Sequence, residues 1–226
     1  MSQLPHYPTD DLARELRQRS PGKLSDDTVS ALDAIYRELA RWAPRLALIG
    51  PGTAGEVLDR HFGESLAALP LLPPPGKGSK TWLDLGSGAG FPGLVLAAVR
   101  PDVTVVLTEP RERKWAFLKT AARKAALPCR CLNARVDFPL PPGLPETLDV
   151  VTVRALQVPP EVLEALARRM GPEGRFLLWV GDEAPEPPAG WNLGRSVPIR
   201  GSERRRIVEW RRANPITEEA ERSHGS

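Results

Sequence analysis

A glycine-rich segment, Asp84-Leu-Gly-Ser-Gly-Ala-Gly-Phe-Pro-Gly93, carries the clearest chemical signal in the sequence. Gly86, Gly88 and Gly90 alternate directly after a short apolar run and just before a helix-forming run. Because glycine has no Cβ, these positions can take positive φ and let a ligand approach the backbone closely. In open α/β sheets, a turn of this kind binds a nucleoside cofactor at the carboxyl end of a strand. The spacing also satisfies the dinucleotide fingerprint Gly-x-Gly-x-x-Gly, so alone it does not choose between cofactors.

Neighbouring residues favour S-adenosylmethionine (SAM) over a dinucleotide. Asp84 lies just before Gly86, where a carboxylate can hold the ammonium group of a methionine moiety but does not help to bind a pyrophosphate. Pro92 fits the start of a helix and gives up an N–H that pyrophosphate binding could use. Glu109 follows the next predicted strand, where an acidic residue about 20 residues beyond the first glycine accepts hydrogen bonds from ribose hydroxyls. Both cofactors contain that ribose, so Glu109 indicates a nucleoside without choosing between them.

Two further positions follow predicted strands. Asn133-Ala-Arg-Val136-Asp137 comes after the third strand, where an acid or amide commonly reaches the adenine in this fold. Arg154 stands at the end of the fourth strand, which opens onto the ligand crevice. By position alone, Arg154 fits either a ligand contact or a salt bridge at a strand terminus.

Alternating strands and helices begin near residue 80, and this rhythm predicts a doubly wound α/β sheet that ends in an antiparallel strand pair. The predicted strands cover residues 81–85, 103–108, 129–134, 148–153, 174–180, 194–199 and 206–210. The predicted helices cover residues 93–100, 111–127 and 161–170, and residues 139–145 form a proline-rich loop. This region, residues 76–213, is the predicted SAM-binding domain.

Residues 1–75 read as a small N-terminal helical cap with a linker. Ser25 has the residue type of a helix N-cap and precedes two acidic residues, and helical spacing of apolar residues then continues as far as Pro44. A second helical stretch is predicted after Pro51-Gly52, with Leu58, Phe62, Leu66 and Leu69 on one face. Residues 1–20 are polar and contain no predicted element. Residues 214–226 are polar, and we expect a disordered tail.

Composition narrows the class of protein. The chain of 226 residues is 41% hydrophobic and 26% charged, as in ordinary globular proteins. It contains no apolar run of the length that spans a membrane, and its N-terminus does not resemble a secretory signal, so we expect a cytoplasmic protein without membrane contact. Two cysteines and three scattered histidines predict no metal site. We expect a monomer.

Arginines crowd the C-terminal region, against a net charge of only +3 for the whole chain. This cluster could contact RNA phosphates. It could equally be a solvated strand edge whose charge prevents aggregation. The residues are Arg195, Arg200, Arg204, Arg205, Arg206, Arg211 and Arg212.

An ordered set of motifs resembles one known family. The motifs are Arg60-His-Phe-Gly-Glu-Ser-Leu66, the glycine segment with its unusual Phe-Pro-Gly ending, Arg113-Lys-Trp-Ala-Phe-Leu118, Ala134-Arg-Val-Asp137, Val153-Arg-Ala155 and Gly201-Ser-Glu-Arg204. Together they are similar to the ribosomal RNA small subunit methyltransferase G (glucose-inhibited division protein B) family. The resemblance implies a Rossmann-like SAM-dependent methyltransferase fold with a mostly parallel seven-stranded sheet and a small helical cap.

The same resemblance implies the activity, which is methylation of N7 of a guanine in the decoding region of 16S rRNA, with 16S rRNA or the 30S subunit as partner. By motif match, the residues that contact SAM are Gly86, Phe91, Glu109, Val136, Asp137 and Arg154. Guanine N7 is a lone-pair nucleophile that carries no proton. Catalysis can therefore rest on alignment with the methyl group, and no general base is predicted.

The sequence departs from the family pattern at positions that concern RNA rather than SAM. Trp42 is followed by Ala-Pro-Arg-Leu-Ala-Leu-Ile49, which lacks the family's Asn-Leu-Thr segment. Gly181 follows a valine instead of a lysine, and Arg205 stands where the family has a histidine. Three alternatives therefore remain open: a SAM-dependent methyltransferase with another substrate, a nicotinamide-dependent oxidoreductase, and a non-catalytic RNA-binding protein.

Overall fold

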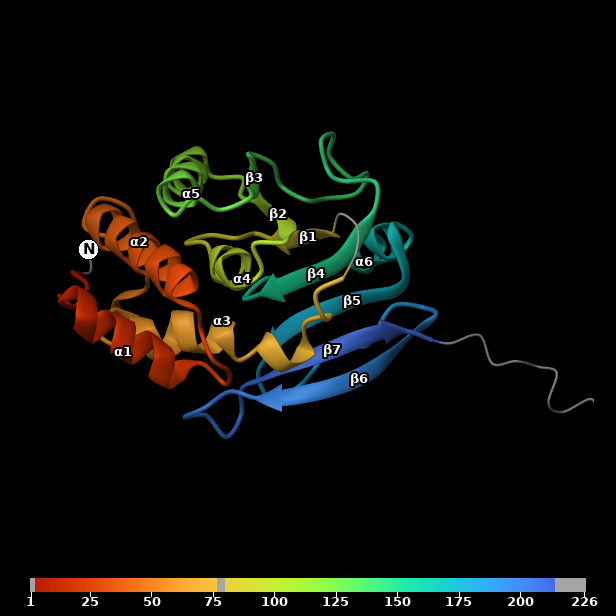
Figure 1. Ribbon diagram of the computed structural model, residues 1–226. Coiled ribbons are helices and arrows are strands. Elements are labelled where there is room, and N and C mark those ends of the chain that lie inside the picture. The colour runs from red at the N-terminus through yellow and green to blue at the C-terminus, as the bar shows by residue number, and fades with distance from the viewer. Residues whose placement is uncertain (1–2, 77–79, 214–226) are drawn as a thin grey trace, which may run out of the picture.

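The computed structural model describes residues 3–76 and 80–213, in which one sheet lies between two layers of helices (Figure 1). The seven strands are arranged in the order β3-β2-β1-β4-β5-β7-β6. Strands β1 to β5 pair in parallel, whereas β7 is antiparallel to both of its neighbours. The bounds are β1 Lys80–Leu85, β2 Val103–Thr108, β3 Cys129–Leu132, β4 Leu148–Arg154, β5 Met170–Val180, β6 Trp191–Pro198 and β7 Arg206–Arg212. The predicted mostly parallel, seven-stranded α/β fold is confirmed.

Side chains of the central strands alternate between two hydrophobic cores, because successive residues of a strand point to opposite faces of a sheet. On β1, Trp82 belongs to one core and Leu83 to the other. On β4, Val150 and Val151 divide in the same way. Both faces of the sheet are therefore buried, which explains why these strands read as continuous apolar runs.

Helices cover the two faces of the sheet unequally. Helices α4 (Gly93–Val99) and α5 (Glu112–Lys124) pack on one face, and α6 (Pro160–Ala167) packs on the other. Helix α4 follows the end of β1 and α5 follows the end of β2. The turns that join these strands to these helices consequently lie together at the carboxyl edge of the sheet, where ligands of this fold class bind.

The cap begins with a helix that the sequence analysis did not predict. Helix α1 (Thr9–Arg19) lies in a polar segment, but Leu12 and Leu16 are four residues apart on one helical face and both are fully buried. Helix α2 (Asp26–Trp42) starts where predicted, because the Ser25 side chain accepts a hydrogen bond from the Thr28 amide at 3.1 Å.

The prediction of a second continuous cap helix is wrong. The stretch is broken into η1 (Pro51–Thr53), the π-helical turn η2 (Leu58–Gly63), α3 (Glu64–Leu66) and η3 (Leu69–Leu71). Gly55 and Gly63 weaken a continuous helix, and Pro70 cannot donate a backbone hydrogen bond. Of the predicted apolar face, Leu58, Phe62 and Leu66 are nevertheless buried and Leu69 is half-buried. The cap side chains share one core with α4 and α5.

Some boundaries also differ from prediction. Helix α6 ends at Ala167, and Met170 starts β5 because it pairs with Leu148 of β4. Residues 133–147 connect β3 to β4 without a helix. The expected tail at residues 214–226 lies outside the described residues. In the described part of the chain, no helix is long and apolar enough to cross a membrane.

Candidate cofactor site

The glycine turn joins β1 to α4 and is held by the end of β2. The Gly86 amide donates to Thr108 Oγ1 at 3.1 Å, and the Ser87 amide donates to the Thr108 carbonyl at 2.8 Å. Gly86, Gly88 and Gly90 have φ values of 63°, 56° and 88°. Side chains with a Cβ rarely adopt this region, which explains why glycine stands at all three positions.

The glycines of the turn serve different purposes. A Cβ on Gly90 would lie 2.3 Å from Leu94 Cδ1, and a Cβ on Gly93 would lie 2.6 Å from Asp84 Oδ2. Both positions therefore need glycine for packing inside the protein. A Cβ on Gly88 would meet only one backbone oxygen, at 3.7 Å. Gly88 thus leaves space at the backbone, as close approach of a ligand would require.

Asp84 lies beneath the turn and is only 1% exposed. Its Oδ2 accepts a hydrogen bond from the Gly93 amide at 3.2 Å, and its Oδ1 accepts one from Thr152 Oγ1 at 2.6 Å. Burial raises the pKa of this carboxyl to about 6, against the lowering effect of these hydrogen bonds. Asp84 therefore connects the turn to β4, and its contact with a methionine ammonium group stays a prediction.

Glu109 follows the end of β2, and its carboxylate is hydrogen-bonded to the glycine turn. Its Oε2 accepts a hydrogen bond from the Gly88 amide at 3.1 Å, and its Oε1 accepts one from the Arg111 amide at 2.9 Å. Asn133 Nδ2 donates to the Glu109 carbonyl at 2.9 Å and so connects the loop after β3 to the same place. The glycine turn and the acidic residue, which the sequence indicated separately, form one hydrogen-bonded unit.

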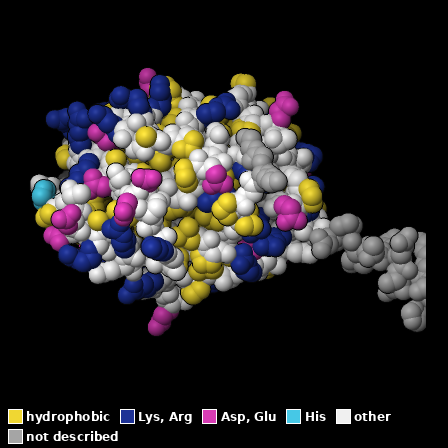
Figure 2. All heavy atoms as spheres, in the orientation of Figure 1, with side chains coloured by type: hydrophobic (Ala, Val, Ile, Leu, Met, Phe, Trp, Pro, Cys, Tyr) yellow, Lys and Arg dark blue, Asp and Glu magenta, His cyan; other side chains and the backbone are white. Residues whose placement is uncertain are grey.

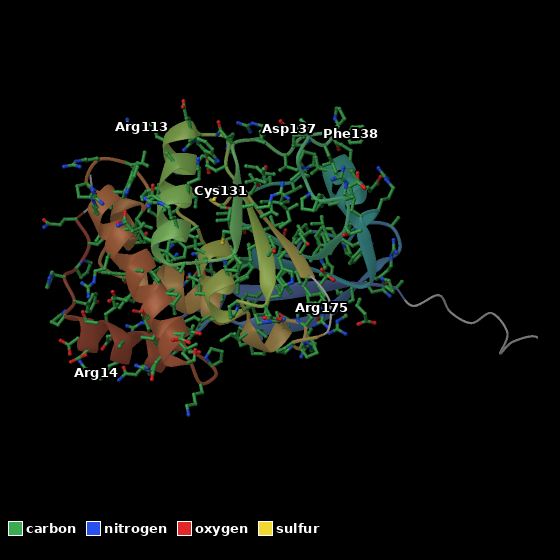
Figure 3. The ribbon with its side chains drawn as sticks, turned by 45° about the horizontal axis from the view of Figure 1, so that its top comes forward. Arg14, Arg113, Cys131, Asp137, Phe138 and Arg175 are labelled. Atoms are coloured by element: carbon green, nitrogen blue, oxygen red, sulfur yellow. The ribbon has the colours of Figure 1, made fainter. Side chains whose placement is uncertain are left out.

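Val136 and Asp137 extend the site along the loop after β3. Val136 is half-buried against the core beneath α6. Asp137 is exposed, and its carboxylate lies 3.8 Å from the Arg135 guanidinium. Figure 3 places Asp137 beside Phe138, and Phe138 is one of the few exposed large apolar side chains among the described residues. Sequence reasoning passed over Phe138.

Phe91 is buried beneath the cap. Its ring centroid lies 5.1 Å from that of His61 and 5.1 Å from that of Phe62, both in η2. Desolvation, followed by the charges of Arg154 and Arg60, lowers the pKa of His61 to about 3, so this ring is neutral. The Phe91 side chain therefore packs the cap against the glycine turn, and a contact of residue 91 with SAM stays a prediction.

Arg154 ends β4 on the other side of β1 and forms a salt bridge. Its Nη2 lies 2.8 Å from Glu64 Oε2 and also donates to the Arg60 carbonyl. Its buried Nη1 has no hydrogen-bond partner among the described residues. Burial, and then the nearby Arg60 charge, lower its pKa to about 10. The salt bridge is present, and a ligand contact by the free Nη1 stays a prediction.

Glu64 is a central residue that sequence reasoning missed. Its carboxylate forms ion pairs with Arg60 at 3.1 Å, with Arg154 and with Arg205 of the loop before β7. Its carbonyl accepts a hydrogen bond from Trp179 Nε1 at 2.8 Å. The four-residue spacing of Arg60 and Glu64 could have indicated their ion pair from the sequence. No sequence signal indicated the pairs with Arg154 and Arg205. Glu64 thus connects the cap, β4 and β5 with the C-terminal hairpin.

The C-terminal arginines are largely engaged within the protein. Arg205 pairs with Glu64, and Arg195 and Arg211 lie within ion-pair distance of the buried Glu209 carboxylate, which also pairs with Arg175 of β5. The Arg206 guanidinium donates to two backbone carbonyls. Arg204 Nη1 lies 3.7 Å from an Asp182 oxygen. Most of these charges consequently support the hairpin, which favours the structural interpretation of the cluster over RNA contact.

All six predicted cofactor residues lie at or next to the carboxyl edge of the sheet. Gly86, Phe91 and Glu109 lie in or next to the turn after β1. Val136 and Asp137 follow β3, on the far side of β2, and Arg154 ends β4, the other neighbour of β1. Backbone amides at positive φ, an acidic side chain and a buried guanidinium together suit a cofactor that contains a ribose and an amino acid carboxylate.

Comparison with known proteins shows the family of the chain. The family described as rRNA small subunit methyltransferase G matches residues 28–187, which is more than half of the chain. A protein from Methylobacterium radiotolerans named ribosomal RNA small subunit methyltransferase G is 38% identical over 195 residues, covering 82% of this chain and 88% of its own. A protein of the same name from Acidiphilium cryptum is 36% identical over 213 residues, covering 90% and 95%.

Solved structures share the fold at lower identity. A SAM-dependent methyltransferase from Aquifex aeolicus has a TM-score of 0.51 at 21% identity and covers 69% of this chain and 92% of its own. The structure of TrmN from Thermus thermophilus has a TM-score of 0.50 at 21% identity and covers 66% and 48%. These two structural similarities support the fold alone. The family match and the similar sequences support membership of the family. The chain therefore belongs to the rRNA small subunit methyltransferase G family of SAM-dependent methyltransferases.

Proposed function

We propose that this protein transfers a methyl group from SAM to N7 of a guanine in the decoding region of 16S rRNA. The observation that carries the proposal is the hydrogen bond between Glu109 and the Gly88 amide, which sets an acidic residue against a glycine turn in a member of this family. A carboxylate at this position can exchange its amide partners for two ribose hydroxyls.

We further propose a role for each of the six residues. The backbone at Gly86 and Phe91 lies along the amino acid part of SAM, and Glu109 binds the ribose. Val136 and Asp137 contact the adenine, with Val136 against its face and Asp137 accepting a hydrogen bond from its amino group. Arg154 presents Nη1, which has no hydrogen-bond partner among the described residues, to the SAM carboxylate.

The chemistry asks little of the protein beyond alignment. SAM would supply an electrophilic methyl group. The N7 lone pair forms the new carbon–nitrogen bond as the carbon–sulfur bond breaks, and S-adenosylhomocysteine leaves. No proton leaves N7, so no side chain is needed as a base. The protein holds the two reacting atoms in line and excludes water, and such positioning is worth about 7–11 kcal/mol in favourable cases.

The reaction also requires no Lewis acid, and all six proposed contacts come from one chain. We therefore propose that the enzyme works as a monomer without a metal ion, in the cytoplasm where ribosomal subunits are. Light scattering during gel filtration and metal analysis of the purified protein test the first two points. A stable dimer or a stoichiometric metal would contradict them.

Methyl transfer to RNA tests the main proposal. Tritiated SAM is incubated with 30S subunits and separately with naked 16S rRNA, and the RNA is digested for nucleoside mass spectrometry. We expect label in N7-methylguanosine from one of the two substrates. Label confined to protein or to small molecules would refute the proposal and favour a methyltransferase with another substrate. Calorimetry with NAD and SAM tests the oxidoreductase alternative, which requires NAD binding.

A further inference from the structure

A pocket outside the cofactor site lies between the C-terminal end of α2 and the outer face of α5. Its volume is about 450 Å³. Five of its lining residues are basic, none is acidic, and Trp42 forms part of the wall. The basic residues are Arg41, Arg45, Arg113, Arg123 and Lys124. Figure 2 shows Lys and Arg side chains gathered over this part of the molecule, at the upper left.

Unlike the C-terminal arginines, the basic residues of this pocket form few salt bridges within the protein. All five basic residues are exposed. Arg41 lies 3.5 Å from Glu38. Among the described residues, no salt bridge joins the other four to a carboxylate. Exposed cations that share one pocket and have few carboxylate partners attract anions, so the arrangement is consistent with an anion-binding site.

Trp42 gives the pocket an aromatic wall in a fixed orientation. Its Nε1 donates to Glu38 Oε2 at 3.1 Å, and its ring lies 6.0 Å from that of Phe117 in an edge-on contact. The side chain remains partly exposed. An aromatic surface beside arginines is the combination that binds single-stranded nucleic acid, because a base stacks while phosphates pair with the guanidiniums.

The pocket is also placed to lead toward the methyl-transfer site. Arg113 lies in the first turn of α5, four residues after Glu109, whereas Arg123 lies in the last turn. At 1.5 Å per residue, the two positions are about 15 Å apart along the helix. Figure 3 places Arg113 on the same side of the molecule as Asp137. A strand bound along α5 would therefore continue to the carboxyl edge of the sheet.

We propose that this α2–α5 pocket binds phosphates of the RNA substrate, with one unpaired base stacked on Trp42. That the RNA is 16S rRNA rests on the proposed function. Arg45 and Leu46 of the pocket wall belong to the segment after Trp42, which lacks the Asn-Leu-Thr expected from the family resemblance. The pocket accordingly gives the altered segment a role in docking RNA.

Charge removal tests the pocket directly. Arg45→Gln with Arg123→Gln removes two of its cations, and Arg14→Gln with Arg168→Gln is a control with the same net charge change at exposed arginines that pair with carboxylates elsewhere. The Kd for 16S rRNA is measured by filter binding at several salt concentrations, and SAM binding by calorimetry. We expect the pocket variant to bind RNA at least 10-fold more weakly and the control within twofold of the unmodified protein.

Salt dependence adds a second readout. Each phosphate that the variant no longer neutralises should reduce the slope of log Kd against log salt by about 0.7–0.9, so removing two cations should reduce it by about 1.4–1.8. SAM affinity should be unchanged in both variants. A pocket variant with the RNA affinity and slope of the unmodified protein would overturn the proposal.

Competitors distinguish the sources of the anion. A 16S-derived single-stranded oligonucleotide should displace 16S rRNA, whereas inorganic phosphate and polyglutamate should not at equal charge concentration. Displacement by phosphate alone, or by polyglutamate, would overturn the assignment to RNA. The proposed function fails separately, when the unmodified protein labels no RNA. If the unmodified protein labels RNA and the pocket variant does so with the same KM, only the pocket proposal fails.

Discussion

Arg154 at the end of β4 forms a salt bridge with Glu64 of the cap, with 2.8 Å between Nη2 and Oε2. The two side chains are 14% and 5% exposed, so the pair is largely removed from water. Because Glu64 also pairs with Arg60 and Arg205, one carboxylate lies within ion-pair distance of three guanidiniums from three parts of the chain.

Glu64→Gln should destabilise the protein strongly. Removing one partner of a buried ion pair leaves the other charges uncompensated, and the typical cost is about 3–5 kcal/mol. We expect a decrease in the free energy of unfolding near the lower value, because Arg60 and Arg205 are partly exposed. Urea denaturation measures it. Glu203→Gln, at an exposed position, serves as control and should change stability by less than about 0.5 kcal/mol. Equal stability of the two variants would contradict this.

Glu109→Gln should weaken SAM binding while leaving the fold intact. A hydrogen bond to a charged group is worth about 1.5–3 kcal/mol, which corresponds to a Kd increase of at least about 10-fold. Calorimetry measures the Kd. Glu112→Gln, three residues on and exposed, should bind SAM as the unmodified protein does. Unchanged affinity in Glu109→Gln would remove this residue from the cofactor site.

Gly88→Ala and Gly90→Ala should separate ligand binding from packing. Both alanines would adopt positive φ, which costs about 1–2 kcal/mol. At Gly90 the Cβ also overlaps Leu94 at 2.3 Å, so we expect a larger loss of stability there. At Gly88 the Cβ finds space in the protein but enters the predicted SAM position, so the loss should be mainly in SAM affinity. Denaturation and calorimetry on both variants test this, and equal stability losses would argue against it.

His61 should make stability fall in acid. Its pKa in the folded protein is about 3, below the ordinary value of 6.5, so the unfolded chain binds a proton that the folded protein does not. The stabilising contribution is complete above pH 6.5 and is lost as the pH falls toward 3. The free energy of unfolding of the unmodified protein, relative to His61→Gln, should fall by up to about 1.4 kcal/mol per pH unit between pH 6 and pH 4.

Asp84 also titrates in this pH range, so the effect of His61 is measured as a difference between the unmodified protein and His61→Gln. Burial raises the pKa of Asp84 to about 6, so its contribution is present at low pH and is lost as the pH rises through 6. That trend opposes the trend of His61 in the same range and cancels when the two proteins are compared. A flat difference between pH 6 and pH 4 would show that His61 is protonated in the folded protein.

The sequence by itself was enough for the features that depend on neighbours in the chain. Glycine alternation, the Ser25 cap and the strand–helix rhythm follow from local backbone preferences and from apolar spacing. The family motifs added the expectation of a seven-stranded sheet, which the structure confirmed. Helix α1 was missed because only two apolar residues in a polar segment mark its buried face, and they become informative only beside the rest of the cap.

Only the tertiary structure decided which charges meet. Glu64 and Arg154 are 90 residues apart, and nothing in either segment indicates the partnership. From the sequence, the C-terminal arginines fitted RNA contact and a solvated strand edge equally well. Folding brings carboxylates and carbonyls to most of them, whereas α2 and α5 bring together cations that the sequence keeps far apart. The charge of a residue can be read from the sequence. Whether that charge is free to bind a ligand depends on which carboxylates and carbonyls the fold places beside it. The glycine turn could therefore be recognised from the sequence, and the surface proposed to hold the RNA could not.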